Sequence, residues 1–191
     1  MKVIIVGNSS NILESKNGTL IDSFDKIIRL GQFVISGYED QVGTRTDICI
    51  TRWGKYTKIT STDRQQIGDV WFPHPEPPNK FSDRYYSGAE HACNLAEYSI
   101  TNEKYIEIGD MCTELKSPDL TLGTASILMA QKYLSEYDIY ITGYCLDMTN
   151  DRLNGKYWDM QITQWNDNHN LLTETMYIRR LINNGNVCQL K

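Results

Sequence analysis

The sequence has few of the features that would tie a protein to a zinc ion, a disulfide framework or a membrane. Its five cysteines are odd in number and form no CxxC pair, which argues against a zinc site or a redox pair. No run approaches the roughly 18 apolar residues of a membrane-spanning helix. The first apolar run, residues 3–6, is too short for the core of a signal peptide. We therefore expect a cytoplasmic protein with no membrane anchor.

An excess of positive charge is also absent. The 19 Lys and Arg residues are outnumbered by 24 Asp and Glu, and the net charge of −5 gives no general attraction to phosphate backbones. This balance argues mildly against a nucleic-acid binder, although it leaves a local basic groove open. The 191 residues are 40% hydrophobic and 23% charged, as in an ordinary globular protein. We expect one domain over residues 1–191.

Short β-branched runs alternate with amphipathic stretches along the chain, which predicts an α/β fold. The expected strands are residues 2–6, 26–30, 47–51, 69–72, 105–108, 138–142 and 186–190, and the expected helices are residues 89–99, 121–137 and 171–184. A helix that feeds directly into a strand is typical of a parallel sheet, so we expect a single Rossmann-like sheet sandwiched by helices. Cys49, Cys145 and Cys188 lie in or beside strands and are expected to be buried free thiols.

The first candidate site is the polar loop after the first expected strand. It contains Gly7, Asn8, Ser9 and Asn11. In open α/β sheets, ligands bind beyond the carboxyl ends of the strands, and glycine lets the backbone approach them. Asn and Ser supply neutral hydrogen bonds to a ribose or a phosphate. An ordinary polar turn with an Asn helix cap explains the same residues, and the GxGxxG fingerprint is absent.

The second candidate is the start of the clearest helix, where Thr121, Gly123 and Thr124 stand. Unpaired backbone N–H groups and the helix dipole make a helix start suitable for an anion. The alternative is plain N-capping by Asp119 or Thr121.

Further candidates are weak when each is taken alone. His169 stands five residues before Glu174 at the start of the last expected helix, and histidine is well suited to accept a proton near neutral pH. A capping or packing role is the alternative for His169. Lys156 and Tyr157 begin a KYWD cluster that reads as a packed surface turn, and residues 43–46 (GTRT) read as a loop with one exposed arginine.

The order of these segments resembles the sialyltransferase family, which has four ordered motifs called large, small, third and very small. The matching segments are residues 3–47 for the large motif, 121–143 for the small motif, 156–159 for the third motif, and His169 with Glu174 for the very small motif. The resemblance leaves out only a variable stretch at about 52–115. It divides the domain into a large-motif half, residues 1–51, and a half with the other three motifs, residues 116–191.

The resemblance implies a GT-A-like variant of the α/β fold and an inverting glycosyltransferase that needs no metal and no cofactor. The donor would be a CMP-linked nucleotide-sugar, classically CMP-sialic acid, and the acceptor would be a glycan. The residues implied in donor binding are Gly7, Asn8, Ser9, Asn11, Thr121, Gly123, Thr124 and Tyr157. His169 would be the general base on the acceptor hydroxyl, and Glu174 would orient it or support the helix start. Lys156, where the family usually has His or Tyr, would stabilise charge on the leaving phosphate in place of a metal.

The chain departs from the family pattern at four positions. Gly31 stands where the pattern Arg-x-Asn has its Asn, and Leu122 replaces a hydroxyl residue of the small motif. These two changes leave the base and the sugar of the donor open. The cysteines that tie the family's large and small motifs are Lys2 and Ser135 here, so that disulfide is absent. This pattern suits a microbial or viral cytoplasmic protein.

Two other functions stay open, because fold does not fix function. The same scaffold could use another nucleotide-sugar and modify bases of phage or viral DNA, which predicts a basic groove built from Arg45, Arg52, Lys55 and Lys58; a solvated charged face is the simpler explanation of that cluster. A non-catalytic module that binds nucleotides or glycans is the third hypothesis. The intact pair of His and Glu in the very small motif argues against it.

Overall fold

A computed structural model describes residues 1–51, 58–71, 73, 109–117, 119–146, 157 and 169–190. Six strands in this part of the chain form one sheet in the order β4-β3-β2-β1-β5-β6, and every neighbouring pair is parallel. The strands are β1 (Lys2–Val6), β2 (Lys26–Leu30), β3 (Thr46–Ile50), β4 (Ile67–Trp71), β5 (Asp138–Thr142) and β6 (Cys188–Gln189). The predicted α/β class with a single Rossmann-like sheet is confirmed.

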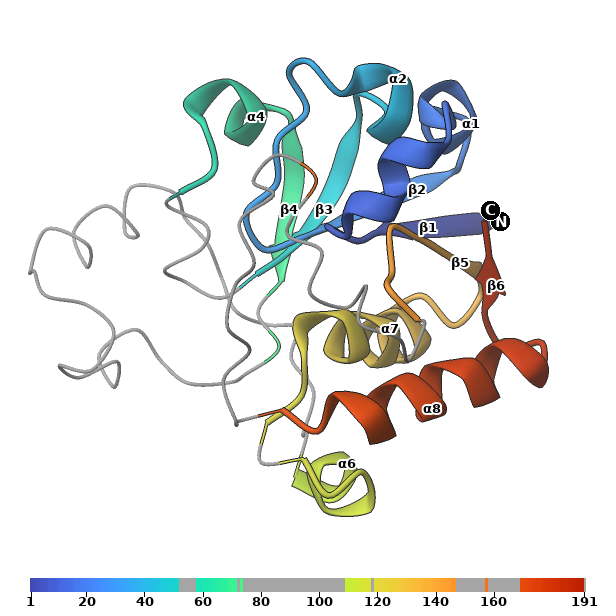
Figure 1. The fold of residues 1–191 in the computed structure, drawn as a ribbon. Coiled ribbons are helices and arrows are strands. Elements are labelled where there is room, and N and C mark those ends of the chain that lie inside the picture. Colours follow the sequence, from blue (N-terminus) through green and yellow to red (C-terminus); the bar gives the residue numbers. More distant parts are fainter. Residues whose placement is uncertain are drawn as a thin grey trace, which may run out of the picture.

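Helices cover both faces of the sheet (Figure 1). They are η1 (Ser10–Glu14), α1 (Gly18–Asp22), α2 (Glu39–Val42), α4 (Ser61–Gln65), α6 (Gly109–Glu114), α7 (Leu122–Tyr133) and α8 (Leu171–Asn183). Successive strand residues point to opposite faces, so Val3 and Ile5 of β1 pack with α7 and α8, whereas Ile4 and Val6 pack with η1, α1 and α2. Burial on both faces explains why the strands read as continuous apolar runs.

The predicted element bounds agree well with the structure. Strands β1, β2 and β5 have the predicted residues, and α8 ends one residue before its predicted end. Helix α7 ends at Tyr133 rather than at residue 137, because Leu134 leaves the helical region with φ −131° and ψ 41°. The expected helix at 89–99 and the expected strand at 105–108 lie outside the described residues.

The cysteine prediction is partly wrong. Cys49 is a buried free thiol, as expected, and burial raises its pKa. Cys145 is only half-buried and Cys188 is exposed, because Cys188 lies on the two-residue edge strand β6. A short edge strand has no neighbour on its outer side to cover its side chains.

All six strands are parallel, so their carboxyl ends lie together along one side of the sheet. We call this side, which is formed by the ends of the strands, the carboxyl edge. The amino terminus lies at the opposite side of the sheet, where β1 begins (Figure 1). The described helices include none with the length and apolar character to cross a membrane. The cytoplasmic location stays a prediction.

Candidate functional site

Strands β1 and β5 meet where the connections between strands change direction along the sheet, the usual place for a ligand in such folds. Gly7 follows β1 and Gly143 follows β5, and their backbones pack so closely that a Cβ on Gly143 would lie 2.6 Å from the Gly7 carbonyl oxygen. The Gly7 N–H donates to Thr142 O and the Ser9 N–H to Gly143 O, which extends the ladder past the strands. The sequence predicts that a ligand approaches the backbone at Gly7. In the structure the group that packs closely against Gly7 is the backbone of Gly143, in the loop after β5.

The Asn8 side chain joins the loops that follow β1 and β2. Its Nδ2 donates to Leu30 O at 2.8 Å and to Gln32 O at 3.1 Å. Carbonyl oxygens only accept, so the amide orientation is fixed and both of its hydrogens are used. The remaining Oδ1 can accept a hydrogen bond from a ligand hydroxyl or amine, but Asn8 has no side-chain hydrogen left for a phosphate.

Asn11 and Gly123 both contact the loop after β5. The Asn11 Nδ2 donates to Tyr144 O at 3.0 Å, and its Oδ1 is buried with no partner among the described residues. A Cβ on Gly123 would lie 3.0 Å from the Tyr144 ring, so glycine here lets that ring pack against the start of α7. The Tyr144 hydroxyl lies 3.3 Å from Gly123 O, and burial raises its pKa. These contacts draw η1, α7 and the β5 loop together at the carboxyl edge.

Glu174, in the first turn of α8, is a buried carboxylate surrounded by donors. Its Oε2 accepts from Thr121 N at 2.8 Å, Thr121 Oγ1 at 2.7 Å and Thr124 Oγ1 at 2.6 Å, and its Oε1 accepts from Ser117 Oγ at 3.0 Å. We call these four residues the Glu174 cluster. It fastens the first turn of α8 to the first turn of α7, because the carboxylate belongs to α8 and accepts hydrogen bonds from Thr121 and Thr124 at the start of α7.

The cluster changes the interpretation of the two threonines predicted to bind the donor. Thr121 is the N-cap of α7, so capping by Thr121 rather than by Asp119 is what the structure shows. Thr124 is fully buried and its hydroxyl donates to Glu174. The side chain of Thr124 therefore lies behind the surface, and it supports the helix start instead of facing a ligand.

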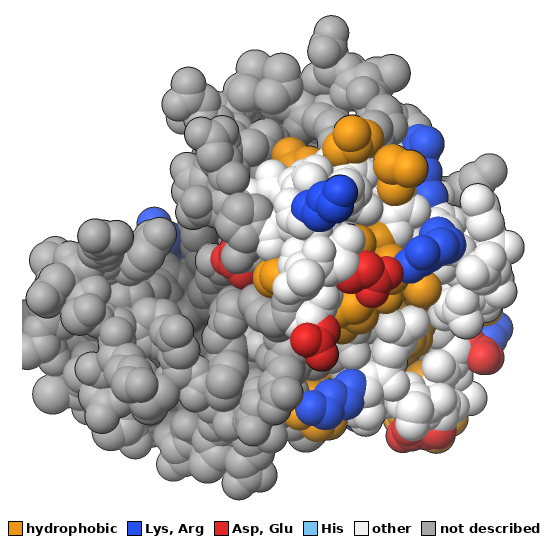
Figure 2. Space-filling model, turned by 90° about the horizontal axis from the view of Figure 1, so that it is seen from below, with side chains coloured by type: hydrophobic (Ala, Val, Ile, Leu, Met, Phe, Trp, Pro, Cys, Tyr) orange, Lys and Arg blue, Asp and Glu red, His pale blue; other side chains and the backbone are white. Residues whose placement is uncertain are grey.

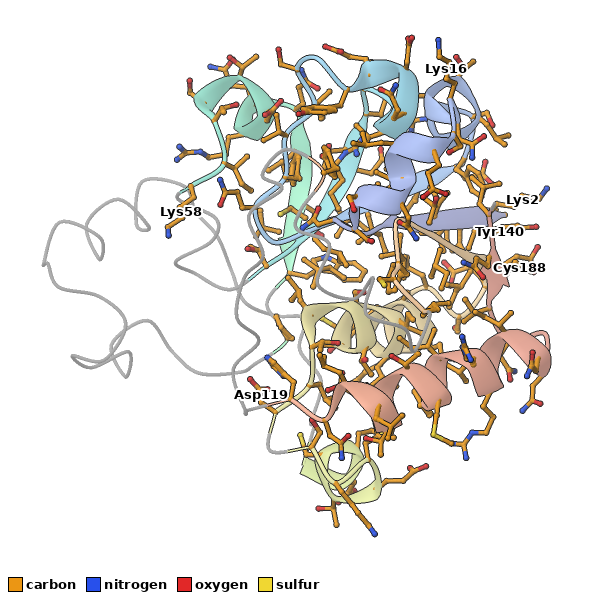
Figure 3. The ribbon with its side chains drawn as sticks, in the orientation of Figure 1. Lys2, Lys16, Lys58, Asp119, Tyr140 and Cys188 are labelled. Carbon is orange, nitrogen blue, oxygen red and sulfur yellow. The ribbon has the colours of Figure 1, made fainter. Side chains whose placement is uncertain are left out.

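His169 immediately precedes the N-cap residue of α8 and is half-buried. Its Nδ1 lies 3.0 Å from the backbone oxygen of Asp119, in the segment that leads into α7. Figure 3 shows Asp119 on the opposite side of the molecule from Lys2, which begins β1. The imidazole is therefore held at the side of the molecule where the strands end, beside the starts of both long helices.

Tyr157 is buried beneath the Asn8 loop. Its backbone N–H donates to Asn8 O at 3.1 Å, and its hydroxyl bonds to the backbone N–H and carbonyl of Val34. Its ring meets Tyr38 edge to face at 5.1 Å. Desolvation by burial raises the pKa of Tyr157 to about 12. The Tyr157 backbone thus supports the Asn8 loop, while its side chain is anchored in the segment that follows β2. Lys156 lies outside the described residues.

Two of the four departures from the family pattern, Gly31 and Leu122, lie next to each other. Gly31 has a left-handed φ of +58°, and a Cβ there would lie 3.2 Å from Leu122 Cδ2. An apolar side chain therefore covers the backbone where β2 ends. Nothing in the sequence alone relates two positions that are 91 residues apart.

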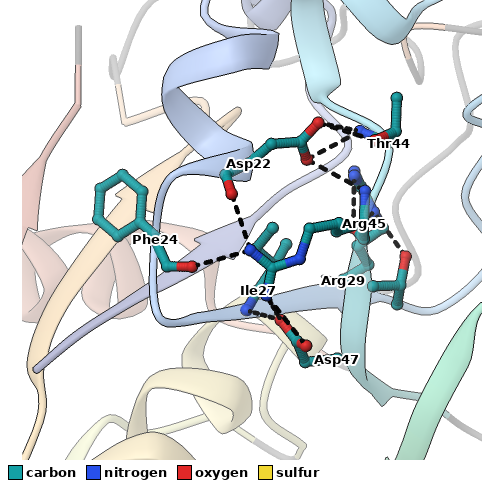
Figure 4. A network of polar contacts seen from close by, with 8 residues as sticks. Asp22, Phe24, Ile27, Arg29, Thr44, Arg45 and Asp47 are labelled. Atoms are coloured by element: carbon teal, nitrogen blue, oxygen red, sulfur yellow. Dashed lines mark hydrogen bonds and ion pairs between the residues drawn. The ribbon is translucent and has the colours of Figure 1, made fainter.

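The GTRT loop is part of a polar network at the other edge of the sheet (Figure 4). The Asp22 carboxylate accepts from the backbone N–H groups of Thr44 and Arg45 and from the Thr44 hydroxyl. Arg45 donates to Asp22 O and Phe24 O and forms an ion pair with Asp47 at 3.2 Å. Arg45 is exposed, as expected, and its hydrogen bonds also make the loop a structural clamp between α1 and β3.

The basic groove of the DNA hypothesis gains no support from the structure. Arg45 is engaged by Asp22, Phe24 and Asp47 in the polar network before β3, whereas Lys58 lies in the segment that leads into α4 (Figure 3). Arg52 and Lys55 lie outside the described residues. The face that α6 and α8 present, seen in Figure 2, mixes acidic, basic and hydrophobic side chains.

Two functional candidates were not predicted from the sequence. Ser117 is buried and belongs to the Glu174 cluster, and Asp119 holds His169 through a backbone oxygen. A lone serine and a main-chain carbonyl leave no signal in a single sequence. Within the described part of the chain, no three His, Cys, Asp or Glu side chains gather as a metal site would require.

The comparisons with known proteins agree with this architecture. Residues 2–70 match the family model of glycosyltransferase family 29, the sialyltransferases. No curated protein matches the chain in sequence. A mammalian sialyltransferase structure covers 100% of this chain with 68% of its own length, at a TM-score of 0.68 and 17% identity.

Two further solved structures carry ligands. The mammalian enzyme in complex with Gal-beta-1-3GalNAc-ortho-nitrophenol aligns with a TM-score of 0.66 and 17% identity, over 100% of this chain and 69% of that one. The sialyltransferase CstII from Campylobacter jejuni in complex with cytidine-5'-monophosphate aligns with a TM-score of 0.54 and 15% identity, over 100% and 80%. The resemblance predicted from the motifs is therefore confirmed, in sequence over residues 2–70 and in fold over the chain.

Proposed function

We propose that this chain, a sialyltransferase-like glycosyltransferase by its family match and its fold, transfers a sugar from a CMP-linked donor to a hydroxyl of a glycan acceptor. The sugar is sialic acid or a related acidic sugar. The reaction inverts the anomeric carbon and needs no metal ion. His169 is its general base.

The observation that carries the proposal is the hydrogen bond between His169 and the Asp119 backbone. A carbonyl oxygen only accepts, so in the neutral ring the proton sits on Nδ1 and the lone pair sits on Nε2. The acceptor hydroxyl gives its proton to Nε2 as its oxygen attacks the anomeric carbon. The bond from that carbon to the phosphate oxygen breaks, and CMP leaves with the electron pair. A positioned base of this kind contributes roughly 10²–10⁴ in rate.

The donor side of the site is argued from the carboxyl edge. One solved relative holds CMP, and the start of a helix as long as α7 is a favourable place for phosphate. We propose that the Asn8 Oδ1 accepts from a donor hydroxyl or amine, that Ser9, Asn11, Thr121 and Gly123 line the pocket, and that Gly7, Thr124 and Tyr157 support it from behind. Tyr157 bonds to the backbone of the Asn8 loop, which supports placing the neighbouring Lys156 as the cation for the leaving phosphate.

The test is the variant His169→Ala, with turnover of CMP-sialic acid and CMP affinity measured separately. We expect turnover to fall roughly 10²-fold or more while CMP affinity is kept, because the base acts only in the chemical step. Arg180→Ala, in the helix that follows His169, is the matched control, since its ion pair with Glu114 is exposed and worth little. Turnover by His169→Ala equal to that of the control would remove His169 as the base.

A further inference from the structure

Ser117 lies where the partner of His169, the start of α8 and the Glu174 carboxylate meet. Its Oγ is 2.7 Å from Asp119 O, 3.0 Å from Glu174 Oε1 and 2.8 Å from the backbone N of Asn170. Its side chain is 3% exposed. We propose that Ser117 is a positioning residue for the base, which holds the Asp119 carbonyl in line with His169 Nδ1. This proposal rests on the proposed role of His169.

The hydrogen bonds of Ser117 cannot all be made at once. The hydroxyl accepts from the Asn170 N–H, and it has one hydrogen for two acceptors, Asp119 O and Glu174 Oε1. Asp119 O already receives the Nδ1–H of His169. The Asp119 carbonyl oxygen therefore accepts hydrogen bonds from both His169 and Ser117. Rotation of the Ser117 O–H bond decides whether the carbonyl is shared or accepts from His169 alone.

The charge of the imidazole sets the direction of that rotation. When Nε2 has taken the acceptor proton, the ring is a cation, and its Nδ1–H bond to Asp119 O becomes charge-assisted and stronger. The Ser117 O–H then turns to the Glu174 carboxylate, whose Oε1 accepts from no other donor among the described residues. No proton is transferred in this rotation. The Ser117 hydroxyl donates to the Asp119 carbonyl in the resting state, and after proton transfer to His169 that carbonyl accepts from the imidazolium alone.

Two further hydrogen bonds from the start of α8 explain why the position of Ser117 is itself fixed. Asn170 Nδ2 donates to Lys116 O at 3.2 Å, and Thr173 Oγ1 donates to Leu115 O. These contacts tie the α8 start to residues on the N-terminal side of Ser117. The serine hydroxyl therefore has little freedom except rotation about its own Cβ–Oγ bond.

The experiment compares Ser117→Ala with Ser126→Ala by nitrogen-detected NMR of the imidazole and by steady-state kinetics. Ser126 is also fully buried, and its Oγ likewise makes two hydrogen bonds, to Gly123 O at 2.7 Å and to the Tyr144 hydroxyl at 3.0 Å. The two variants thus lose comparable contacts, but only one touches the partner of His169. The resonance of His169 among the three histidines is assigned from its loss in His169→Ala.

The wild type and Ser126→Ala are expected to show the neutral ring with its proton on Nδ1. Ser117→Ala should show a mixture of both tautomers and a kcat about tenfold lower, with KM for donor and acceptor changed by less than about twofold. A wild-type tautomer and kcat in Ser117→Ala, with a loss of thermal stability equal to that of Ser126→Ala, would make Ser117 a purely structural residue. A wild type that transfers no sugar would defeat the proposed function, and the tautomer would still decide the role of Ser117.

Discussion

At the scale of single residues, Glu174 combines full burial with hydrogen bonds to both carboxylate oxygens. Three donors reach Oε2 and one reaches Oε1, and the side chain is 2% exposed. A charge taken out of water is tolerated only where such bonds replace its hydration. The acidic residue of the very small motif is therefore first of all the fastening between α7 and α8.

Glu174→Gln is expected to lower the free energy of unfolding by about 2–3 kcal/mol, because an amide NH₂ group would face donors instead of accepting from them. Urea denaturation measures the loss. Glu114→Gln is the control on an exposed ion pair and should change stability by less than about 1 kcal/mol. Equal losses in the two variants would show that the cluster does not stabilise the fold.

Tyr157 makes the free energy of unfolding depend on pH in the alkaline range. Burial raises its pKa from 10.0 to about 12, so the unfolded chain loses the phenolic proton at lower pH than the folded one. The stabilising contribution is complete below pH 10 and is lost as the pH rises towards 12, at about 1.4 kcal/mol per pH unit. Urea denaturation at pH 10, 11 and 12 should show a less steep decline in Tyr157→Phe than in the wild type. Parallel declines would contradict the burial of this hydroxyl.

Residues with an ionisable side chain could be predicted as site candidates from the sequence, but the groups that hold them in place could not. His169 and Glu174 could be picked out because an imidazole and a carboxylate stood in a spaced motif at a helix start. Ser117 and the Asp119 carbonyl could not, because they are defined only by contacts across 50 or more positions of the chain. The inward orientation of Thr124 was hidden for the same reason, since its hydroxyl is turned by Glu174.

At the scale of elements, the sheet depends on the glycines that follow β1 and β5. Gly143 has a φ of +66°, and any Cβ there would press on the Gly7 carbonyl. Gly185 has a similar φ of +74° after α8, but open space around its Cβ position. Substitution of Gly185 therefore tests the cost of the left-handed backbone alone, whereas substitution of Gly143 tests that cost together with steric crowding.

Gly185→Ala should lower the free energy of unfolding by about 1 kcal/mol, the usual penalty of a left-handed alanine. Gly143→Ala should lose about 3 kcal/mol, because the β1 and β5 loops must also move apart. Chemical denaturation of both variants measures the difference. Equal losses would mean that the two loops do not pack against each other.

The strands and long helices were predictable because periodicity and turn residues are local signals. Strand β5 is followed by Gly143 and α8 is followed by Asn184 and Gly185, so these turn-forming residues marked the two ends in the sequence. Helix α7 was predicted too long, since Tyr133, Leu134 and Tyr137 suit a helix by composition and only the packed structure shows where the turn begins. The edge strand β6 was predicted too long for a similar reason, because pairing with β5 decides its length.

At the scale of the whole molecule, the two edges of the sheet have different tasks. The edge at which the strands begin carries the Asp22–Arg45–Asp47 clamp, and the carboxyl edge carries the Asn8 loop, the Glu174 cluster and His169. Parallel strands place all of their following loops at one edge, so residues from distant parts of the sequence meet there. This separation explains why Arg45 belongs to the scaffold, whereas His169 lies in the candidate site.

The central claim is that the carboxyl edge binds a cytidine nucleotide without a metal ion. Calorimetric titration of the whole chain with CMP, UMP and GMP, each with a chelator present, tests it most directly. We expect CMP to bind with measurable heat and at least about tenfold more tightly than UMP or GMP, a difference of about 1.4 kcal/mol. Preference for UMP or GMP, binding that disappears with the chelator, or no binding of any of the three would contradict the claim.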